Sequence, residues 1–313
     1  MNKFVLILCA TILCTGCKKE TPILGIEGIT LKNYPKVDGS TSCRALNQMV
    51  ACKLLGIRYK WTESSTFSAG VSEWYLNPEG KEFEIFLWER IKTSQTHNAF
   101  INLIDGNADI ILTHRIISSD EKAHADAVGV TLIETPIASD AFVFIVHKKN
   151  PVKSLTVNEI QKIYTKKITN WSEIGGNKKD INAYLRPRNS GSEEVFRTLV
   201  MDGLEPADFP ESFYVSDMPV VFITMLWDED GICYSFNNYA DVILRNTEVP
   251  KIAINGIKPN ISTVKNNTYP LISRVYVAIR SDLDRNTMAY KLFEWLQSED
   301  AKSTIEECGF VTK

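Results

Sequence analysis

The sequence predicts an α/β protein whose sheets are rich in parallel strands. Apolar strand patterns alternate along the chain with amphipathic helix patterns, which is the order that α/β architectures produce. The chain has 313 residues, of which 44% are hydrophobic and 23% charged, so its composition is that of a soluble globular protein with one large domain or two ordinary ones. The formal net charge of −3 gives no indication of a nucleic-acid partner, and no internal apolar stretch reaches the roughly 18 residues of a membrane span.

The N-terminus predicts an export signal followed by a lipid-bearing cysteine. Lys3 precedes the apolar run 4–13, and small residues then lead to Cys17. A short basic start, a short apolar core and small residues before a break are typical of a secretory signal peptide, and small residues before a cysteine resemble a bacterial lipobox. A buried first helix or strand is the alternative. We therefore expect residues 1–16 to be removed and Cys17 to anchor an exported lipoprotein on the periplasmic or extracellular side of a membrane.

The first half of the chain contains two helix starts that follow polar turns. The sequence "DGSTS", residues 38–42, precedes a helical pattern that Ser40 or Thr41 could cap. The stretch 93–106 reads as a turn, a helix that Thr96 or Asn98 could cap, and a stop at glycine. Between these segments, residues 62–80 have a loop-like composition, and residues 83–91 fit a strand or a short helix. A buried strand is expected over residues 108–115.

The second half of the chain continues the alternation. Two capping boxes, Thr156 with Glu159 and Ser190 with Glu193, predict helix starts, and the second helix should run to about Met201. The expected strands cover residues 140–146, 181–185, 231–236, 251–256 and 269–279. The chain should end in an amphipathic helix around Leu292 and a further helix that stops at glycine.

Four cysteines lie beyond Cys17, and their spacing fits no metal motif. Cys43 and Cys52 on one helix would lie about 13 Å apart, which is too far for a disulfide. We therefore expect buried free thiols at Cys43, Cys52, Cys233 and Cys308.

Three polar stretches, residues 38–42, 94–98 and 189–193, share one pattern of a strand end, small hydroxyl residues and a helix start. The first N–H groups of a helix lack internal partners, and the helix dipole places partial positive charge there, so such a segment favours an anion. Each stretch alone is an ordinary turn with a cap. Arg186, just before the third stretch, is not needed for a cap, and its planar double donor suits an oxyanion.

Catalytic and metal motifs are missing from the sequence. It contains no Walker loop, H-E-x-x-H pair, G-x-S-x-G elbow or G-x-G-x-x-G motif, and its four histidines have no metal-ligand spacing. A nucleophilic Ser40 or Ser190 would need a partnered base, for which His114 is the one plausible residue. We therefore expect no enzyme activity, no metal and no cofactor.

The chain resembles the phosphate-binding proteins of bacterial high-affinity phosphate ABC transporters. The most specific likeness runs over residues 137–196, from "IASDAFVFIVHKKNPVKSLTVNEIQKIYTKKITNWSEIGG" to "INAYLRPRNSGSEEVF". The stretches "DGSTS", "THNAFINLIDGNADI", "NTYPLISRVYVAI" and "LFEWLQSEDAKSTIEECGFV" match in the same order. The likeness covers nearly all of the chain that follows the export signal.

The resemblance implies a two-lobed periplasmic-binding-protein fold of type II, with the ligand in the cleft between the lobes. The first lobe would hold residues 17–137 and 268–313, and the second lobe residues 138–267. Family members bind phosphate without metals, through hydroxyls, helix-start amides and one arginine. Carried over by position, the implied ligand-binding residues are Ser40, Thr41, Ser42, Thr96, Arg186, Ser190, Gly191 and Ser192.

The chain departs from the family at His114 and Arg115. Some members have an aspartate at the position of His114, which accepts the proton that phosphate carries and sulfate lacks, and others have Ser followed by Arg. His114 and Arg115 are therefore carried over as ligand-binding residues, with the choice of anion left open. His114 pointing away from the cleft is the alternative. Arg188 is an addition with no assigned role.

These observations predict a monomeric, lipid-anchored solute-binding protein that captures inorganic phosphate and delivers it to a membrane permease. The alternatives are a binding protein for sulfate or a phosphorylated solute, a phosphoester hydrolase that uses Ser190 or Thr41, and a surface adhesion or signalling lipoprotein.

Overall fold

The computed structural model describes residues 25–64, 71–245 and 248–312. The predicted export signal, residues 1–16, and the predicted lipid-bearing Cys17 lie outside the described residues. Among the residues that are described, no helix is long and apolar enough to cross a membrane.

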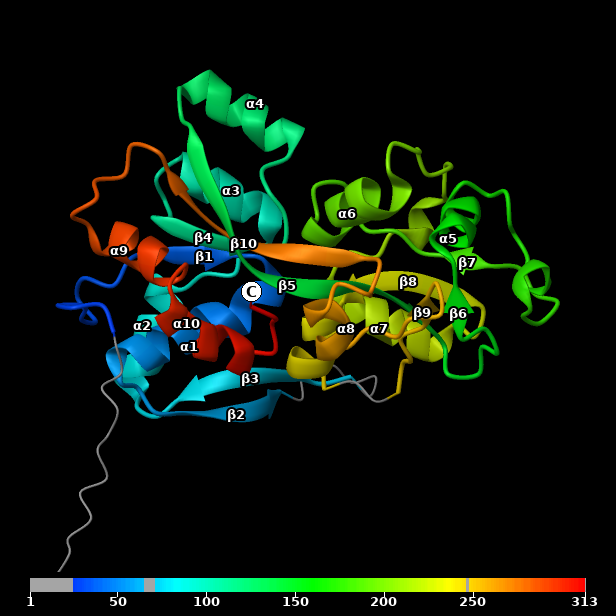
Figure 1. Cartoon of the computed structure of the whole chain (residues 1–313), viewed down its shortest axis with the longest axis horizontal. Helices are drawn as coiled ribbons and strands as arrows, with labels where there is room; N and C mark the ends of the chain where they lie inside the picture. The colour runs from blue at the N-terminus through cyan, green and yellow to red at the C-terminus, as the bar shows by residue number, and fades with distance from the viewer. Residues whose placement is uncertain (1–24, 65–70, 246–247, 313) are drawn as a thin grey trace, which may run out of the picture.

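A six-stranded sheet forms the centre of the molecule, in the order β1-β4-β10-β5-β8-β7 (Figure 1). Its strands are β1 (Val37–Gly39), β4 (Ile110–Thr113), β10 (Ile272–Arg280), β5 (Leu132–Val146), β8 (Gly231–Phe236) and β7 (Asn182–Ala183). The outer pairs, β1 with β4 and β7 with β8, are parallel, whereas the pairs that involve β5 or β10 are antiparallel. The prediction of parallel-rich sheets is therefore wrong, because the chain crosses the centre of the molecule along β5 and returns along β10 in the opposite direction.

Strand β5 belongs to two lobes at once. Its residues up to Ala141 pair with β10, and its residues from Phe142 onward pair with β8. Figure 1 shows the two groups of helices that flank the two ends of these long strands. The predicted mixed α/β, two-lobed fold is confirmed. The predicted lobe boundary after residue 137 lies inside β5, because this strand continues without a break from one lobe into the other.

Helices cover the sheet in both lobes. Those of the first lobe are η1 (Thr41–Cys43), α1 (Arg44–Leu55), α2 (Lys81–Arg90), α3 (Thr96–Ile104), α4 (Ser119–Val128), α9 (Met288–Trp295) and α10 (Glu299–Glu307). Those of the second lobe are α5 (Val157–Tyr164), η2 (Trp171–Ile174), α6 (Gly191–Val195), the π-helical η3 (Phe196–Met201), η4 (Glu211–Phe213), α7 (Met218–Trp227), the π-helical η5 (Tyr239–Ile243) and α8 (Ile261–Lys265). The predicted capping box of α5 is confirmed, since Thr156 and Glu159 bond reciprocally to each other's backbone N–H.

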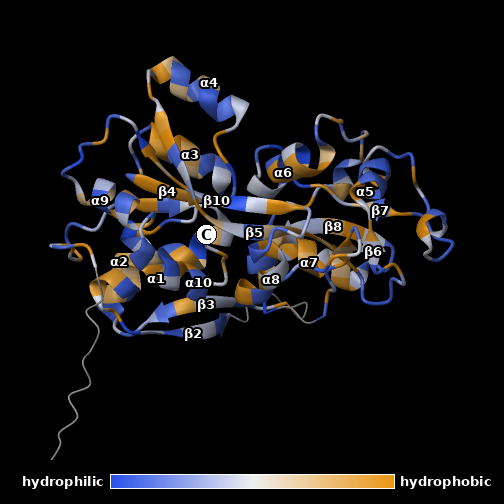
Figure 2. Cartoon of the chain, viewed as in Figure 1, coloured by the Kyte–Doolittle hydropathy of each residue, from blue (hydrophilic) through white to orange (hydrophobic). Residues whose placement is uncertain are grey.

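The core follows the apolar runs that the sequence shows. Residues 138–146 of β5 are all buried, and Figure 2 shows hydrophobic residues concentrated on β4, α3 and α7, which pack around the central strands. The four expected thiols, at Cys43, Cys52, Cys233 and Cys308, are buried and free, as predicted.

Two paired strands, which form a β-hairpin, occupy part of the stretch that the sequence analysis assigned to loop. Strands β2 (Tyr59–Ser64) and β3 (Glu73–Pro78) pair antiparallel, and residues 81–90 form a helix rather than a strand. A smaller two-stranded parallel sheet joins β6 (Ser154–Leu155) to β9 (Ala253–Ile254), so the strand expected over 251–256 shortens to two residues. The hairpin was missed because its strands carry alternating polar residues that resemble those of a loop.

The hairpin also ties the lobes together through a buried carboxylate. Glu73, which is 4% exposed, accepts hydrogen bonds from the Tyr239 hydroxyl at 2.6 Å and from the Tyr75 hydroxyl at 2.6 Å. Nearby, the Arg245 guanidinium lies 3.7 Å from the centroid of the Trp74 ring. Tyr239 and Arg245 belong to the second lobe, so these contacts join the hairpin of the first lobe to the second lobe.

Candidate functional site

Three polar stretches from the two lobes meet around one small pocket of about 30 Å³. The first lobe contributes the turn between β1 and α1 and the start of α3, and the second lobe contributes the loop after β7 and the starts of α6 and α7. The lining residues are Ser40, Thr41, Ser42, Gln95, Thr96, Arg186, Ser190, Gly191, Ser192 and Met218. Eight of the ten predicted ligand-binding positions therefore lie in one place, and the remaining two, His114 and Arg115, do not line the pocket.

The turn between β1 and α1, which is the first of the three polar stretches, is held in place by Asp38. The sequence analysis did not single out this residue. Asp38 is fully buried, and its carboxylate accepts hydrogen bonds from the Ser94 backbone N–H at 2.9 Å and from the Asn102 side chain at 2.7 Å. This carboxylate thereby joins the end of β1 to the loop that starts α3. The next position requires a glycine, Gly39, because a Cβ there would lie 2.5 Å from the Leu112 carbonyl oxygen.

Two further residues that the sequence analysis missed line the pocket, one from each lobe. Gln95 has a left-handed backbone with φ of 67°, and its side chain donates to Asp217 of the second lobe at 3.2 Å. Met218 lines the pocket from the first residue of α7. Thr96 begins α3, and Gln95 takes the cap position without a side-chain hydrogen bond, so the predicted caps at Thr96 and Asn98 are wrong. Ser40 does occupy the N-cap position of η1, which leads into α1, but its hydroxyl lies 3.3 Å from the Ser42 hydroxyl and makes no cap hydrogen bond to a backbone N–H.

The third polar stretch, from the loop after β7 to the start of α6, is built around a buried glutamate. The Ser190 hydroxyl accepts from the Glu193 backbone N–H at 3.2 Å, which confirms half of the predicted capping box. The Glu193 carboxylate does not return this bond. It accepts instead from the Tyr234 hydroxyl, the Arg186 backbone N–H and the Arg197 side chain. The helix does run to Met201, as predicted, but its second part is π-helical.

Several donors that face this site are buried without a partner. Among the described residues, the Ser192 hydroxyl and the Nε and Nη1 atoms of Arg186 make no hydrogen bond. Arg186 is 4% exposed, and burial lowers the pKa of its guanidinium. Buried polar groups are normally hydrogen-bonded, so donors that have no protein partner at a pocket indicate a binding site for a polar ligand. Arg186 is also held in place, since its backbone N–H donates to the Tyr234 hydroxyl at 3.0 Å.

His114 and Arg115 lie behind the pocket wall. The His114 Nδ1 atom lies 2.8 Å from the hydroxyl of the lining residue Ser42. Arg115 makes two hydrogen bonds to Glu121, at 2.7 and 2.6 Å, and reaches the Asn189 carbonyl of the second lobe at 3.4 Å. Arg188 is exposed and does not line the pocket. The structure thus singles out Arg186 among the three arginines.

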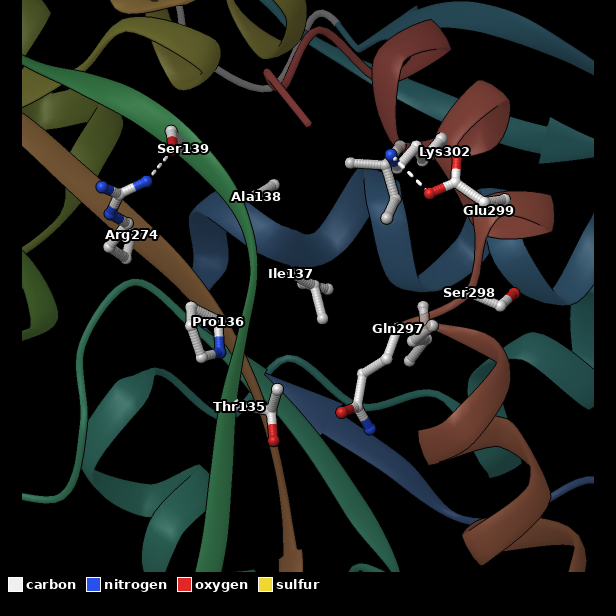
Figure 3. Close-up of a pocket in the computed structure, with 12 residues that line it drawn as sticks. Thr135, Pro136, Ile137, Ala138, Ser139, Arg274, Gln297, Ser298, Glu299 and Lys302 are labelled. Atoms are coloured by element: carbon white, nitrogen blue, oxygen red, sulfur yellow. Dashed lines mark hydrogen bonds and ion pairs between the residues drawn. The ribbon is translucent and has the colours of Figure 1, made fainter. Parts of the chain in front are cut away.

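Three larger pockets lack this arrangement, and one of them, of about 230 Å³, lies beside Ile163, Lys166 and Phe209, away from the polar stretches. Another, of about 320 Å³, lies between β5 and the turn from α9 to α10 (Figure 3). Its charged side chains pair with neighbours, since Arg274 donates to Ser139 at 2.6 Å and Lys302 bonds Glu299 at 2.7 Å. The largest of the three, of about 950 Å³, lies between the hairpin and α2 and is lined by both acidic and basic residues. The small pocket is therefore the candidate site despite its size.

Comparison with known proteins places this architecture among binding proteins. A model of the PBP superfamily domain matches residues 61–300. The phosphate-binding protein PstS of Bacillus subtilis is 27% identical over 208 residues, which cover 66% of this chain and 63% of the relative, less than two thirds of its length. PstS of Staphylococcus saprophyticus is 26% identical over 70% of this chain and 69% of the relative.

Solved structures share the fold. An ABC-type phosphate transport receptor from Vibrio cholerae superimposes with a TM-score of 0.61 at 21% identity, over 91% of this chain and 100% of that chain. A substrate-binding protein from Clostridium perfringens, solved with bound phosphate, superimposes with a TM-score of 0.64 at 23% identity, over 88% of this chain and 98% of that chain.

Proposed function

This chain belongs to the family of the PBP superfamily domain, and we propose that it captures inorganic phosphate and delivers it to the membrane permease of an ABC transporter. The ligand would lie in the small pocket between the lobes. Relatives named as phosphate-binding proteins support this substrate. The chain would act by binding and release, without catalysis.

The observation that carries this proposal is the set of buried donors without partners. Ser192 and Arg186 direct such donors at a pocket whose other side consists of Ser42 and Thr96. A tetrahedral oxyanion accepts hydrogen bonds in several directions at once, so it can satisfy donors from both lobes. Hydrogen bonds to a charged group contribute about 1.5–3 kcal/mol each, so a few of them suffice for micromolar affinity, which corresponds to about −8 kcal/mol.

The size of the pocket favours phosphate over a larger phosphorylated solute. A pocket of about 30 Å³, lined by residues of both lobes, suits a small ion better than a larger phosphorylated solute. The Gly191 position shows how closely the walls meet, because a Cβ there would lie 2.3 Å from the Thr96 hydroxyl oxygen. Sulfate and arsenate have the same shape as phosphate and remain the relevant competitors.

The geometry does not favour a phosphoester hydrolase that uses Ser190 or Thr41. His114 contacts Ser42 rather than either of these residues. Burial alone lowers the pKa of His114, but the Cys43 sulfur and the Asp140 carboxylate outweigh this effect and raise the pKa to about 9. An imidazolium has no free nitrogen lone pair to accept a proton from a nucleophile, so it cannot act as the general base.

The proposal includes the export and anchoring that the N-terminal sequence predicts. Residues 1–16 would be removed, and Cys17 would carry a lipid that holds a monomeric binding protein on the outer side of a membrane. The lobes would comprise residues 17–137 with 268–313 and residues 138–267. Replacing Cys17 with alanine should abolish the incorporation of a labelled fatty acid and release the protein from the membrane fraction, whereas replacing the buried Cys43 should not.

Calorimetric titration of the purified protein with phosphate, sulfate and arsenate tests the function directly. Phosphate should bind with a stoichiometry of one and micromolar or tighter affinity. The absence of heat and of any phosphate-dependent melting shift would favour an adhesion or signalling role instead. Turnover of a chromogenic phosphoester would favour the hydrolase.

A further inference from the structure

His114 is a buried side chain behind the pocket that the proposed binding function does not yet use. It is 1% exposed, and its ring stacks on Phe236 with centroids 4.0 Å apart. Its Nδ1 atom lies 2.8 Å from the Ser42 hydroxyl, which lines the pocket, and 3.5 Å from the Cys43 sulfur. The imidazole therefore touches the ligand's proposed partner without touching the pocket itself.

The other side of the His114 ring faces a carboxylate at the crossing between the lobes. Its Nε2 atom lies 3.5 Å from Asp140 Oδ2, which is an ion-pair distance longer than a normal hydrogen bond. The backbone N–H groups of Ala141 and Asn238 donate to the same carboxylate. The Phe310 ring centroid lies 5.6 Å from that of His114 and completes the surroundings of the ring with Phe236. Among the described residues, the charged group that pairs with His114 is the Asp140 carboxylate.

The protonation of His114 decides what Ser42 can offer a ligand. A protonated imidazole only donates, so its Nδ1–H bonds the Ser42 oxygen and leaves the hydroxyl proton free to point elsewhere. A neutral imidazole with a bare Nδ1 would take that proton and leave only the oxygen lone pairs of Ser42 for the ligand. Because the pKa of His114 is raised to about 9, the donor arrangement holds at neutral pH.

The described lining of the pocket contains hydroxyls, an arginine, a glutamine and backbone groups, and no carboxylate. A carboxylate would accept a proton from the ligand and repel an anion that carries none. We propose that His114 is a positioning residue that keeps the Ser42 hydroxyl as a donor, so that the site recognises tetrahedral oxyanions without requiring a proton on the ligand. This inference rests on the proposed binding of phosphate, and it adds sulfate to the anions that the site accepts.

Competition between sulfate and phosphate tests the inference at about pH 5.5 and pH 8, on either side of the usual histidine pKa. In the native protein, sulfate should bind within about tenfold of phosphate, and the ratio should change little with pH once ligand protonation is counted. His114→Asp reverses the Ser42 hydrogen bond and places an anion behind it, so the preference for phosphate should rise at least about tenfold. His114→Asn keeps an uncharged donor near the Nδ1 position and should retain the native preference.

Each outcome separates the inference from the proposed function. Tight phosphate binding with sulfate weaker by more than about a hundredfold would leave the function intact and overturn the inference. Equal weakening of both anions in His114→Asp and His114→Asn would reduce His114 to a structural support and also overturn it. Failure of the native protein to bind either anion would overturn both proposals. The ¹⁵N chemical shifts of His114 at about pH 7.5 should be those of an imidazolium, and a neutral tautomer there would contradict the mechanism.

Discussion

Replacing Arg186 with alanine should weaken phosphate binding by about 2–4 kcal/mol, which is roughly 30-fold to 1,000-fold in Kd. The guanidinium is 4% exposed, and its Nε and Nη1 atoms have no protein partner among the described residues, so both are free to bond an anion. The variant loses two charge-assisted hydrogen bonds to the anion, which contribute about 1.5–3 kcal/mol each. It also no longer carries the cost of burying an unpaired cation, and subtracting this cost gives the expected range.

The same reasoning predicts an opposite effect on the ligand-free protein. A buried cation without a partner is costly, and burial already lowers the pKa of Arg186. Arg186→Ala should therefore leave the ligand-free unfolding free energy unchanged or raise it, while phosphate no longer raises the melting temperature. The assays are calorimetric titration and denaturant unfolding, with circular dichroism as a check on the fold.

Arg188 supplies a matched control for this experiment. It lies two residues further along the same loop, is exposed and does not line the pocket. Arg188→Ala should change the Kd by less than about threefold. If phosphate binding survives Arg186→Ala within about threefold, or if Arg188→Ala is equally damaging, the pocket is wrongly assigned.

Other predictions follow from the contacts between the lobes and from His114. Gly191→Ala should weaken phosphate binding at least about tenfold, because its Cβ would lie 2.3 Å from Thr96 Oγ1; unchanged titration heats would contradict this. Phosphate should raise the melting temperature and reduce the radius of gyration in solution scattering, and a melting shift without compaction would argue against a closing clamp. Tyr239→Phe should lower the unfolding free energy by about 1–3 kcal/mol, because Glu73 loses a buried donor, and a denaturant titration measures this loss. His114 has a pKa of about 9, above its unfolded value of 6.5, so its stabilisation is complete below pH 6.5 and is lost as the pH rises through about 9, a change of order 3 kcal/mol. His114→Asn should remove this part of the pH dependence of unfolding, and an identical pH profile in the variant would refute the pKa assignment.

The positions of the site residues along the chain could be predicted because they depend on short-range patterns. A strand that ends, small hydroxyl residues and a helix that begins are visible in the stretches around Ser42, Thr96 and Ser192, and the structure brings all three around one pocket. Arg186, beside the third stretch, could also be singled out from the sequence, because a helix cap does not require an arginine.

The partners of polar side chains could not be predicted in the same way. The sequence analysis placed Glu193 in a capping box, whereas its carboxylate bonds Tyr234, which lies 41 residues away. Asp38 looked like part of an ordinary turn, yet it joins β1 to the loop before α3 through Ser94, 56 residues away. Nothing near these residues in the sequence identifies such partners.

By itself, the sequence determined the apolar segments of the core, several helix starts and the three polar stretches, because these follow from residues within about one helical turn or one strand of each other. The tertiary structure alone decided the antiparallel crossing of β5 and β10, and the orientation of His114 toward Ser42, 72 residues away, rather than into the pocket. The physical reason is that a buried polar side chain is oriented by whichever donors, acceptors and charges surround it after folding, and for His114 these come from chain segments that meet only in the folded protein.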